Sequence, residues 1–246
     1  MRLSFTLLSL LILIFLALNM PHLLEFTPVW PDEAWIADVA LNILKTGQVS
    51  TDIWNGMIPG ASQHVFWYPP VFFYLLAFWF KIFGFSIITQ RLLALFISAL
   101  FISLFYFFSK LLISKEAPKI SETKMFLFAF LGSLLLIIDP TFFRSSVLSR
   151  PEILILVLVT CSLLLISKAL SLTDRRVAVK GICFIIAGLL IGVSVLTHFL
   201  AGILLLTLLF YVTLSLKKFF FDKKRIIINE HSRYRWSGIY WFAHHP

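Results

Sequence analysis

Charged residues are scarce in this sequence of 246 residues: only 13% are Asp, Glu, Lys or Arg, against about 25% in an ordinary soluble domain. Hydrophobic residues make up 60% of the chain, and the mean hydropathy is +0.95. So little charge cannot give a folded chain of this length a mainly polar surface. The composition therefore excludes a soluble enzyme and indicates a protein whose main solvent is lipid.

Cysteine is scarce as well, because the chain has only Cys161 and Cys183, both within apolar runs. Cysteine in such runs usually packs as a small hydrophobic side chain, so no disulfide framework or thiolate metal site can be identified. The net charge is +9, which alone would be compatible with a nucleic-acid partner. The positive residues, however, lie in short clusters between hydrophobic segments, and this pattern indicates membrane orientation instead.

Long uncharged segments, in contrast, are abundant, and several approach the roughly 20 apolar residues that one spanning helix needs. The first runs from Leu3 to Leu24. No small-x-small cleavage motif follows it, so we expect a retained first helix rather than a cleaved signal peptide. The sequence predicts an all-α fold: a polytopic transmembrane helical bundle of about six spans.

Three clusters of Lys and Arg set the predicted topology, because these residues accumulate in short cytoplasmic loops. The clusters lie within residues 110–124, 168–180 and 217–225. All three can be cytoplasmic only if the segment from Tyr68 to Gly84 does not cross the bilayer. That segment is dense in aromatic residues and carries Lys81, a composition that favours a helix in the outer interface.

The remaining crossings follow from these constraints. Residues 181–216 carry no formal charge and are about twice as long as one span, so they are divided into two helices. The turn between them, Thr197 to Gly202, is then external, and residues 21–68 form the first external loop. The other predicted crossings are residues 91–109, 125–143 and 153–167.

The first external loop holds most of the polar residues. Its helix opens on WPDE, with a proline in the first turn and two acids at the positive end of the helix dipole, and it ends at Lys45 and Gly47. An apolar stripe along this segment predicts an amphipathic, interfacial helix. Asp32 and Glu33 have two interpretations: they complement the helix dipole, or they supply a catalytic carboxylate at the boundary between water and lipid.

The second external loop brings Arg150 and Glu152 together just before a hydrophobic helix. These residues either cap the helix and anchor it at the interface, or bind a phosphate, since a guanidinium group matches phosphate oxygens bidentately. Asp139, the only acid in its apolar segment, either faces the bundle interior or marks a helix end. His64 and His198 are candidates for contacting phosphate or metal, with a structural hydrogen-bonding role as the alternative.

Four segments follow one another along the chain in an order and at a spacing that are unlikely to arise by chance. They are PDEAWIADVALNILKTG, then WYPPVFFYLLAFWFKIFG with the arginine of QRLLALFISAL, then SRPEILILVLV, and finally GLLIGVSVLTHFLAGILLL. Together they resemble the C-type glycosyltransferases of membranes, most closely the group of bacterial protein O-mannosyltransferases and aminoarabinose transferases. The resemblance covers roughly residues 1–216 and implies the N-terminal half of such an enzyme. Residues 217–246 are expected to form a basic cytoplasmic tail, or a truncated or artefactual end.

The resemblance implies a sugar donor linked to a polyprenyl phosphate, with transfer to a hydroxyl group at the extracytoplasmic face. Asp32 matches the family's catalytic aspartate. As general base it would take the proton of the acceptor hydroxyl while the lipid phosphate leaves the anomeric carbon, with inversion. No cofactor is certain, a divalent cation stays open, and the ligands of any metal are unknown. The residues expected to contact the donor are Glu33, His64, Tyr68, Arg150, Glu152 and His198.

Three of these residues depart from the family's pattern. Glu152 stands where aspartate is common, and Tyr68 and His198 stand where lysine is common. A phosphate contact made by lysine is therefore not carried over to Tyr68.

The sequence predicts a membrane glycosyltransferase, a hexosyl- or pentosyltransferase, in a bacterial or archaeal plasma membrane with its active face outside. Its partners would be the lipid-linked sugar, the membrane lipid and an acceptor glycan, lipid or protein, and no nucleic acid. Two alternatives are a non-catalytic protein that binds or translocates lipid-linked glycans, and an inactive truncated relative. Polar residues that concentrate in external loops, rather than near the midplane of several helices, favour surface chemistry over transport.

Overall fold

The structure is a computed structural model that describes residues 2–23, 28–65, 67–172 and 177–203, together with 205–207, 209–210 and 213–214. The chain divides into two compact units, Met1–Ala201 and Gly202–Pro246, and the described residues of the second unit are helical. Across the described residues every regular element is a helix and none is a strand. This confirms the predicted all-α fold class.

Long apolar helices form the bundle in the part of the chain that the structure describes. Four of them are long and apolar enough to cross a membrane alone, and α5 with the short helix that follows it makes up to a fifth crossing. The sixth predicted crossing follows the turn Thr197–Gly202 and falls on residues 203–216, several of which lie outside those described. The long helices are α1 (Arg2–Asn19), α4 (Ile87–Glu116), α5 (Glu122–Ile138), α7 (Pro151–Ser171) and α8 (Val177–Val195).

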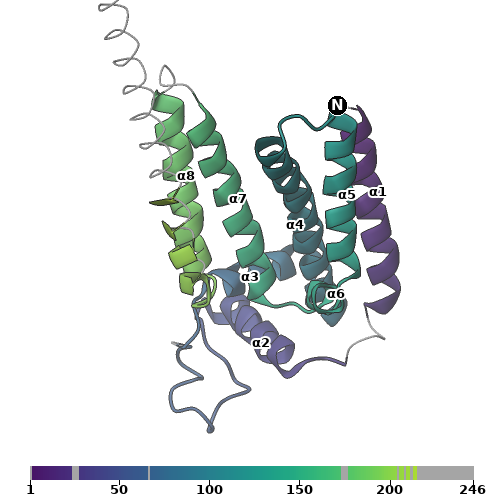
Figure 1. The fold of residues 1–246 in the computed structure, drawn as a ribbon. Helices are drawn as coiled ribbons and strands as arrows, with labels where there is room; N and C mark the ends of the chain where they lie inside the picture. Colours follow the sequence, from purple (N-terminus) through teal and green to yellow (C-terminus); the bar gives the residue numbers. More distant parts are fainter. Residues whose placement is uncertain are drawn as a thin grey trace, which may run out of the picture. The chain divides into compact units, whose positions relative to one another are not determined.

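Three shorter helices gather at one end of this bundle, which we call the cap end: α2 (Pro31–Thr46), α3 (Val71–Phe83) and α6 (Pro140–Val147). Figure 1 shows them where α1 ends and where α4 and α7 begin. A short 3₁₀ turn, η1 (Met20–His22), follows α1 at this end.

The opposite end, which we call the basic end, holds the N-terminus and the starts of α5 and α8 (Figure 1). The lysines of the first two predicted basic clusters belong to helix ends on this side, which supports the prediction that the two clusters share one face of the membrane. Arg175, Arg176 and the third cluster lie outside the described residues. The described lysines in question are Lys110, Lys115, Lys119, Lys124, Lys168 and Lys180.

Helix α3 is shorter than a crossing. Its 13 residues span about 20 Å at about 1.5 Å per residue, whereas the hydrocarbon core is about 30 Å thick. It ends at Gly84, whose φ of +83° lies in the region that favours glycine, and α4 begins directly beyond, at the same end of the bundle. This length supports the prediction that the segment from Tyr68 to Gly84 does not cross the bilayer.

The crossing predicted over residues 125–143 is interrupted at Asp139. The Asp139 Oδ1 atom accepts a hydrogen bond of 2.8 Å from the Phe142 N–H, which caps a new helix, and Pro140 occupies the first helical position, where no N–H is needed. Helices α5 and α6 therefore meet at a bend of 69°. Of the two interpretations of Asp139, the helix end is the one confirmed.

The bundle packs as membrane helices do. Small residues let α7 and α8 approach closely, and the Ser162 hydroxyl donates across the interface to the Ala187 carbonyl at 3.2 Å. On the outside, large apolar side chains such as Leu135 and Leu189 are about two-thirds exposed (66% and 64%). Exposed apolar surface on this scale requires lipid rather than water around it. The protein is an integral membrane protein that crosses the bilayer several times.

We predict that the cap end and the basic end face opposite sides of the membrane. Single cysteines would replace Ser62, near the cap end, and Ser114, near the basic end, in a chain that lacks Cys161 and Cys183. An impermeant thiol reagent should label only one of them in right-side-out vesicles and only the other in inverted vesicles. Labelling of both from the same side would mean that α3 crosses the bilayer, because α3 and α4 together would return the chain to its starting side.

Candidate active site

The start of α2 sets the position of the first candidate residues. Pro31 occupies the first helical position, and the Trp30 N–H donates to the Glu33 Oε2 at 3.1 Å, which satisfies one backbone group at the open helix end. Gly47, with φ of +76°, ends the helix where the sequence predicted. Asp32 thereby lies in the first turn of an interfacial helix at the cap end.

Asp32 is held from two sides and is still accessible. Its Oδ2 lies 3.4 Å from Arg150 Nη2, and its Oδ1 accepts a hydrogen bond of 3.4 Å from the Trp35 indole N–H. The Asp32 side chain is 38% exposed, whereas Trp35 is buried against α3. A carboxylate that is oriented by its neighbours and open to solvent can accept a proton from a bound hydroxyl group.

Arg150 links Asp32 to the second candidate carboxylate. Its Nη2 lies 2.7 Å from the Glu152 Oε1, so one guanidinium group bridges two acids that are distant in sequence. Arg150 precedes α7, and Glu152 lies in the first turn of that helix, next to Pro151. The structure thus brings Asp32, Arg150 and Glu152 together. The sequence indicated that Arg150 and Glu152 are neighbours, but it gave no signal for their contact with Asp32.

Hydrogen-bonding groups of this cluster are left open. Among the described residues, the buried side-chain atoms without a hydrogen-bond partner are Ser149 Oγ, Arg150 Nε, Glu152 Oε2 and Ser167 Oγ, so three of the four lie within residues 149–152. Buried polar atoms in proteins are nearly always bonded. A concentration of free donors and acceptors beside Asp32 is therefore a place where a polar ligand would be stabilised.

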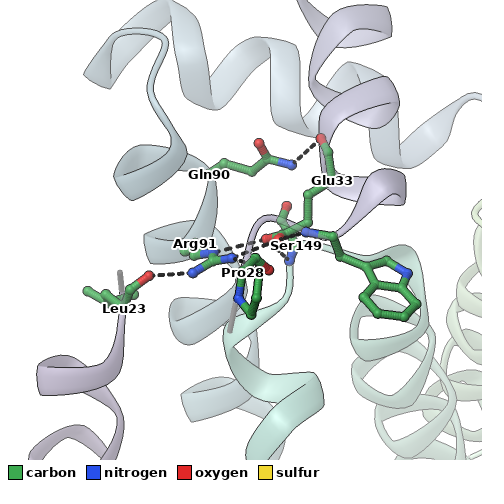
Figure 2. A network of polar contacts seen from close by, with 7 residues as sticks. Leu23, Pro28, Glu33, Gln90, Arg91 and Ser149 are labelled. Atoms are coloured by element: carbon green, nitrogen blue, oxygen red, sulfur yellow. Dashed lines mark hydrogen bonds and ion pairs between the residues drawn. The ribbon is translucent and has the colours of Figure 1, made fainter. Parts of the chain in front are cut away.

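Glu33 plays a different part from its neighbour Asp32 (Figure 2). It is 0% exposed, and its Oε2 lies 2.8 Å from Arg91 Nη2, a group on α4 that is itself 1% exposed. The Glu33 Oε1 accepts from the Arg91 Nε–H at 3.1 Å and from the Ser149 N–H at 3.3 Å. A side chain without exposed surface cannot contact a bound sugar donor. The geometry therefore does not support the expected donor contact at Glu33.

Arg91 completes a network that ties four segments together (Figure 2). It also donates to the Leu23 carbonyl at 2.6 Å, while the neighbouring Gln90 amide donates to the Glu33 carbonyl at 3.0 Å. In the sequence, Arg91 stands out only as part of a matching segment, and no role is predicted for it. An available signal was its position in an apolar helix, because a charge there is costly unless an opposite charge accompanies it.

Tyr68 and His198 meet beside the cluster. The Tyr68 ring packs edge-on against Trp35, with ring centres 5.3 Å apart, and edge-on against His198, with ring centres 4.8 Å apart. Burial raises the pKa of Tyr68 well above its ordinary value; Glu152 and Asp32 raise it further, and Arg150 opposes them. The phenol therefore stays protonated and keeps its ability to donate a hydrogen bond.

His198 is held in its neutral form. Its Nδ1 accepts a hydrogen bond of 3.1 Å from the Leu200 N–H, which leaves the proton on Nε2. Burial lowers the pKa of His198, the nearby Glu152 raises it, and Arg150 lowers it. Of the two interpretations given to this histidine, the hydrogen-bonded structural role is the one this geometry supports.

A cavity of about 570 Å³ opens beside Tyr68, and we call it the aromatic pocket. Its walls come from Val49, from the segment that leads into α3, from Tyr74 of α3 and from the residues that follow α8, and none of these described residues is Lys or Arg. The exposed His64 lies on its wall, so the structure assembles Tyr68 and His64 around one cavity, with His198 in contact behind. The aromatic rings of this pocket belong to Trp67, Tyr68, Tyr74 and Phe199.

In the described part of the chain, no three His, Cys, Asp or Glu side chains come together as the ligands of a metal ion would. The sequence left a divalent cation open. The two carboxylates of this site, Asp32 and Glu152, share the guanidinium group of Arg150, which already provides a positive charge between them.

In the part of the chain that the structure describes, three of the four unpartnered buried polar atoms lie within residues 149–152, at the cap end of a polytopic helical bundle. This arrangement is typical of a membrane enzyme with a site at the bilayer surface. A family model, that of the dolichyl-phosphate-mannose-protein mannosyltransferases, matches residues 68–227, which is more than half of the chain. The protein therefore belongs to this family of membrane glycosyltransferases, which confirms the resemblance seen in the sequence. No curated protein and no solved structure matches the chain.

We predict that the buried ion pair is needed for the fold. Arg91→Met leaves the Glu33 carboxylate buried without its charged partner, which should lower the free energy of unfolding by about 3 to 5 kcal/mol. The measurement is thermal or dodecyl-sulfate unfolding of the purified protein in micelles. Lys81→Met, which removes an exposed charge at the same end, is the matched control, and equal stability of the two variants would contradict the prediction.

A second prediction concerns pH. Because its pKa is lowered in the fold, His198 stays neutral where the unfolded chain, with a His pKa of about 6.5, already takes up a proton. The contribution of His198 is thus fully present above about pH 6.5 and is lost as the pH falls below that value. His198→Asn keeps an acceptor for the Leu200 N–H but cannot titrate. Its melting temperature should fall less than that of the unsubstituted protein between neutral and mildly acidic pH, and parallel curves would contradict this.

Proposed function

We propose that the protein transfers a sugar from a polyprenyl-phosphate donor to a hydroxyl group at the outer face of a bacterial or archaeal plasma membrane. Family membership supports the reaction class, and the positive-inside rule supports the side, because the described lysines of the first two basic clusters lie at the end opposite to Asp32. The acceptor is a lipid, a glycan or a protein, and the sugar is a hexose or a pentose.

The observation that carries this proposal is the accessible Asp32 carboxylate, which Trp35 and Arg150 hold in place from opposite oxygens. Asp32 would take the proton from the acceptor hydroxyl as its oxygen forms the new bond to the anomeric carbon. The bond from that carbon to the phosphate oxygen breaks, and its electron pair leaves with the lipid phosphate. The configuration at the anomeric carbon is inverted, because the acceptor and the phosphate occupy opposite faces of the sugar.

Arg150 would stabilise the departing phosphate. Its guanidinium group presents planar paired donors, and its Nε–H has no partner among the described residues, so a phosphate oxygen would find a free hydrogen bond there. Glu152 keeps the group oriented through one oxygen, and its other oxygen is free to accept from a sugar hydroxyl. Preorganised charge of this kind is usually a large part of catalysis, since it needs no rearrangement during the reaction.

Tyr68 and His64 would bind around the sugar rather than the phosphate. The protonated Tyr68 hydroxyl is a hydrogen-bond donor, and the aromatic pocket offers ring faces on which a sugar can pack. His198 would position Tyr68 through their edge-on contact without touching substrate itself.

Asp32→Asn separates a catalytic role from helix-dipole complementation. Loss of a general base should lower the transfer rate by about 10² to 10⁴, whereas loss of an exposed dipole interaction costs only about 0.3 to 1 kcal/mol of stability. The assay follows transfer from labelled polyprenyl-phosphate mannose, with donor binding and melting temperature measured in parallel.

Asp52→Asn is the matched control, because it makes the same chemical change at an exposed position of the same loop. Near-normal transfer by Asp32→Asn would refute its role as base. Donor binding without any transfer, in the unsubstituted protein as well, would instead favour the non-catalytic protein that binds or translocates lipid-linked glycans.

A further inference from the structure

A second pocket of about 490 Å³ lies next to Arg150, and we call it the α6 pocket. It is formed by the short helix α6, by the segment leading into α7 and by the residue before α2. The part of its wall that bears on binding consists of Trp30, Thr141, Arg144, Ser145, Leu148 and Arg150.

The polar groups of the α6 pocket suit an anion. Two arginines and two hydroxyl-bearing residues line this space, and none of the described residues that line it is Asp or Glu. The Arg144 guanidinium lies over the Trp30 ring, 5.3 Å from its centre, which fixes a long side chain that would otherwise be mobile at the surface. Arg150 shares its charge with Asp32 and Glu152, whereas Arg144 forms no ion pair with any described residue, so the pocket keeps an excess of positive charge.

The apolar groups of the pocket suit a lipid. Trp30 and Leu148 contribute to the wall, and Trp30 is 42% exposed at the cap end, where a tryptophan typically marks the boundary between headgroups and hydrocarbon. A phosphate attached to an isoprenoid chain would find charge for its headgroup and an apolar approach for its chain. A free phosphate would gain nothing from the apolar part of the wall.

We propose that the α6 pocket binds the phosphate of the lipid-linked donor, with Arg144 as a second phosphate ligand beside Arg150. This assignment rests on the proposed function and names the place where its leaving group is held. Arg150 borders the α6 pocket and contacts Asp32; Asp32 in turn contacts Trp35, which packs on Tyr68 of the aromatic pocket. Asp32 thus stands between the two pockets, so the phosphate leaves toward α6 while the acceptor enters from the aromatic side.

The test measures binding of farnesyl phosphate to the full chain in phosphatidylcholine nanodiscs, with no transfer reaction involved. Arg144→Gln should weaken binding on the order of tenfold, because a charge-assisted hydrogen bond to phosphate is lost. Lys81→Gln, which removes one exposed positive charge from the same end of the bundle, is the matched control and should bind normally. Ser145→Glu keeps both arginines but places a negative charge on the pocket wall, and it should weaken binding as well.

Several outcomes would overturn the assignment: equal affinity of Arg144→Gln and Lys81→Gln, normal binding by Ser145→Glu, or farnesol bound as tightly as farnesyl phosphate. Inorganic phosphate bound as tightly as farnesyl phosphate would overturn the lipid as its source. Failure of the proposed function looks different. If Asp32→Asn still transfers sugar while Arg144→Gln loses farnesyl phosphate binding, Asp32 is not the base and the assignment of the α6 pocket is retained. If transfer needs Asp32 but not Arg144, Asp32 is retained as the base and the assignment of the α6 pocket is overturned.

Discussion

The buried ion pair between Glu33 and Arg91 is the interaction on which the cap end depends. Two charges removed from both water and lipid headgroups are stable only when nearly every donor and acceptor is used, and here both carboxylate oxygens and the nitrogens of the guanidinium group have partners. Glu33 is the direct neighbour of Asp32, and Ser149, which donates to Glu33, is the direct neighbour of Arg150. One saturated pair therefore sets the relative position of the two residues that we place in the reaction.

Charged residues form a second, unsaturated arrangement nearby, in which Asp32 adjoins Glu33 and Arg150 adjoins Ser149. Arg91 is 1% exposed and fully engaged, while Arg150 is 38% exposed and has a free Nε–H. Asp32 and Glu152 are about one-third exposed and share one cation between them. The Glu33–Arg91 pair, whose hydrogen-bonding groups all have partners, holds the neighbouring Asp32 and Arg150 in place. Asp32 and Arg150 keep exposed groups that a substrate can reach, and preorganised electrostatic catalysis requires both properties.

The elements with strong local signals could be predicted from the sequence. Helix α2 begins at the proline of WPDE and ends at Gly47, and the crossings predicted over residues 91–109 and 153–167 fall within α4 and α7. The bend at Asp139 was one of two open interpretations, because an aspartate before a proline signals a helix start as readily as it signals a polar group inside a bundle. In each of these cases the determining residues are close neighbours in the chain.

The contacts that build the site had no such signal. Glu33 and Arg91 are separated by 58 positions, and Ser149 reaches Glu33 across 116, so only the folded bundle reveals which of two adjacent acids is structural. The sequence assigned both acids to the site, and the burial of Glu33 separates them. No role was predicted for Arg144, and only the folded chain brings it together with Arg150 on the wall of the α6 pocket.

Positive charge is distributed unevenly around Asp32. Tyr68 and His198 are both uncharged: burial raises the pKa of the tyrosine, and burial lowers that of the histidine. Among the described residues that form the aromatic pocket beside Tyr68, none is Lys or Arg. In the reaction that we propose, a departing phosphate would therefore meet positive charge on the other side of Asp32, where Arg150 and Arg144 border one pocket.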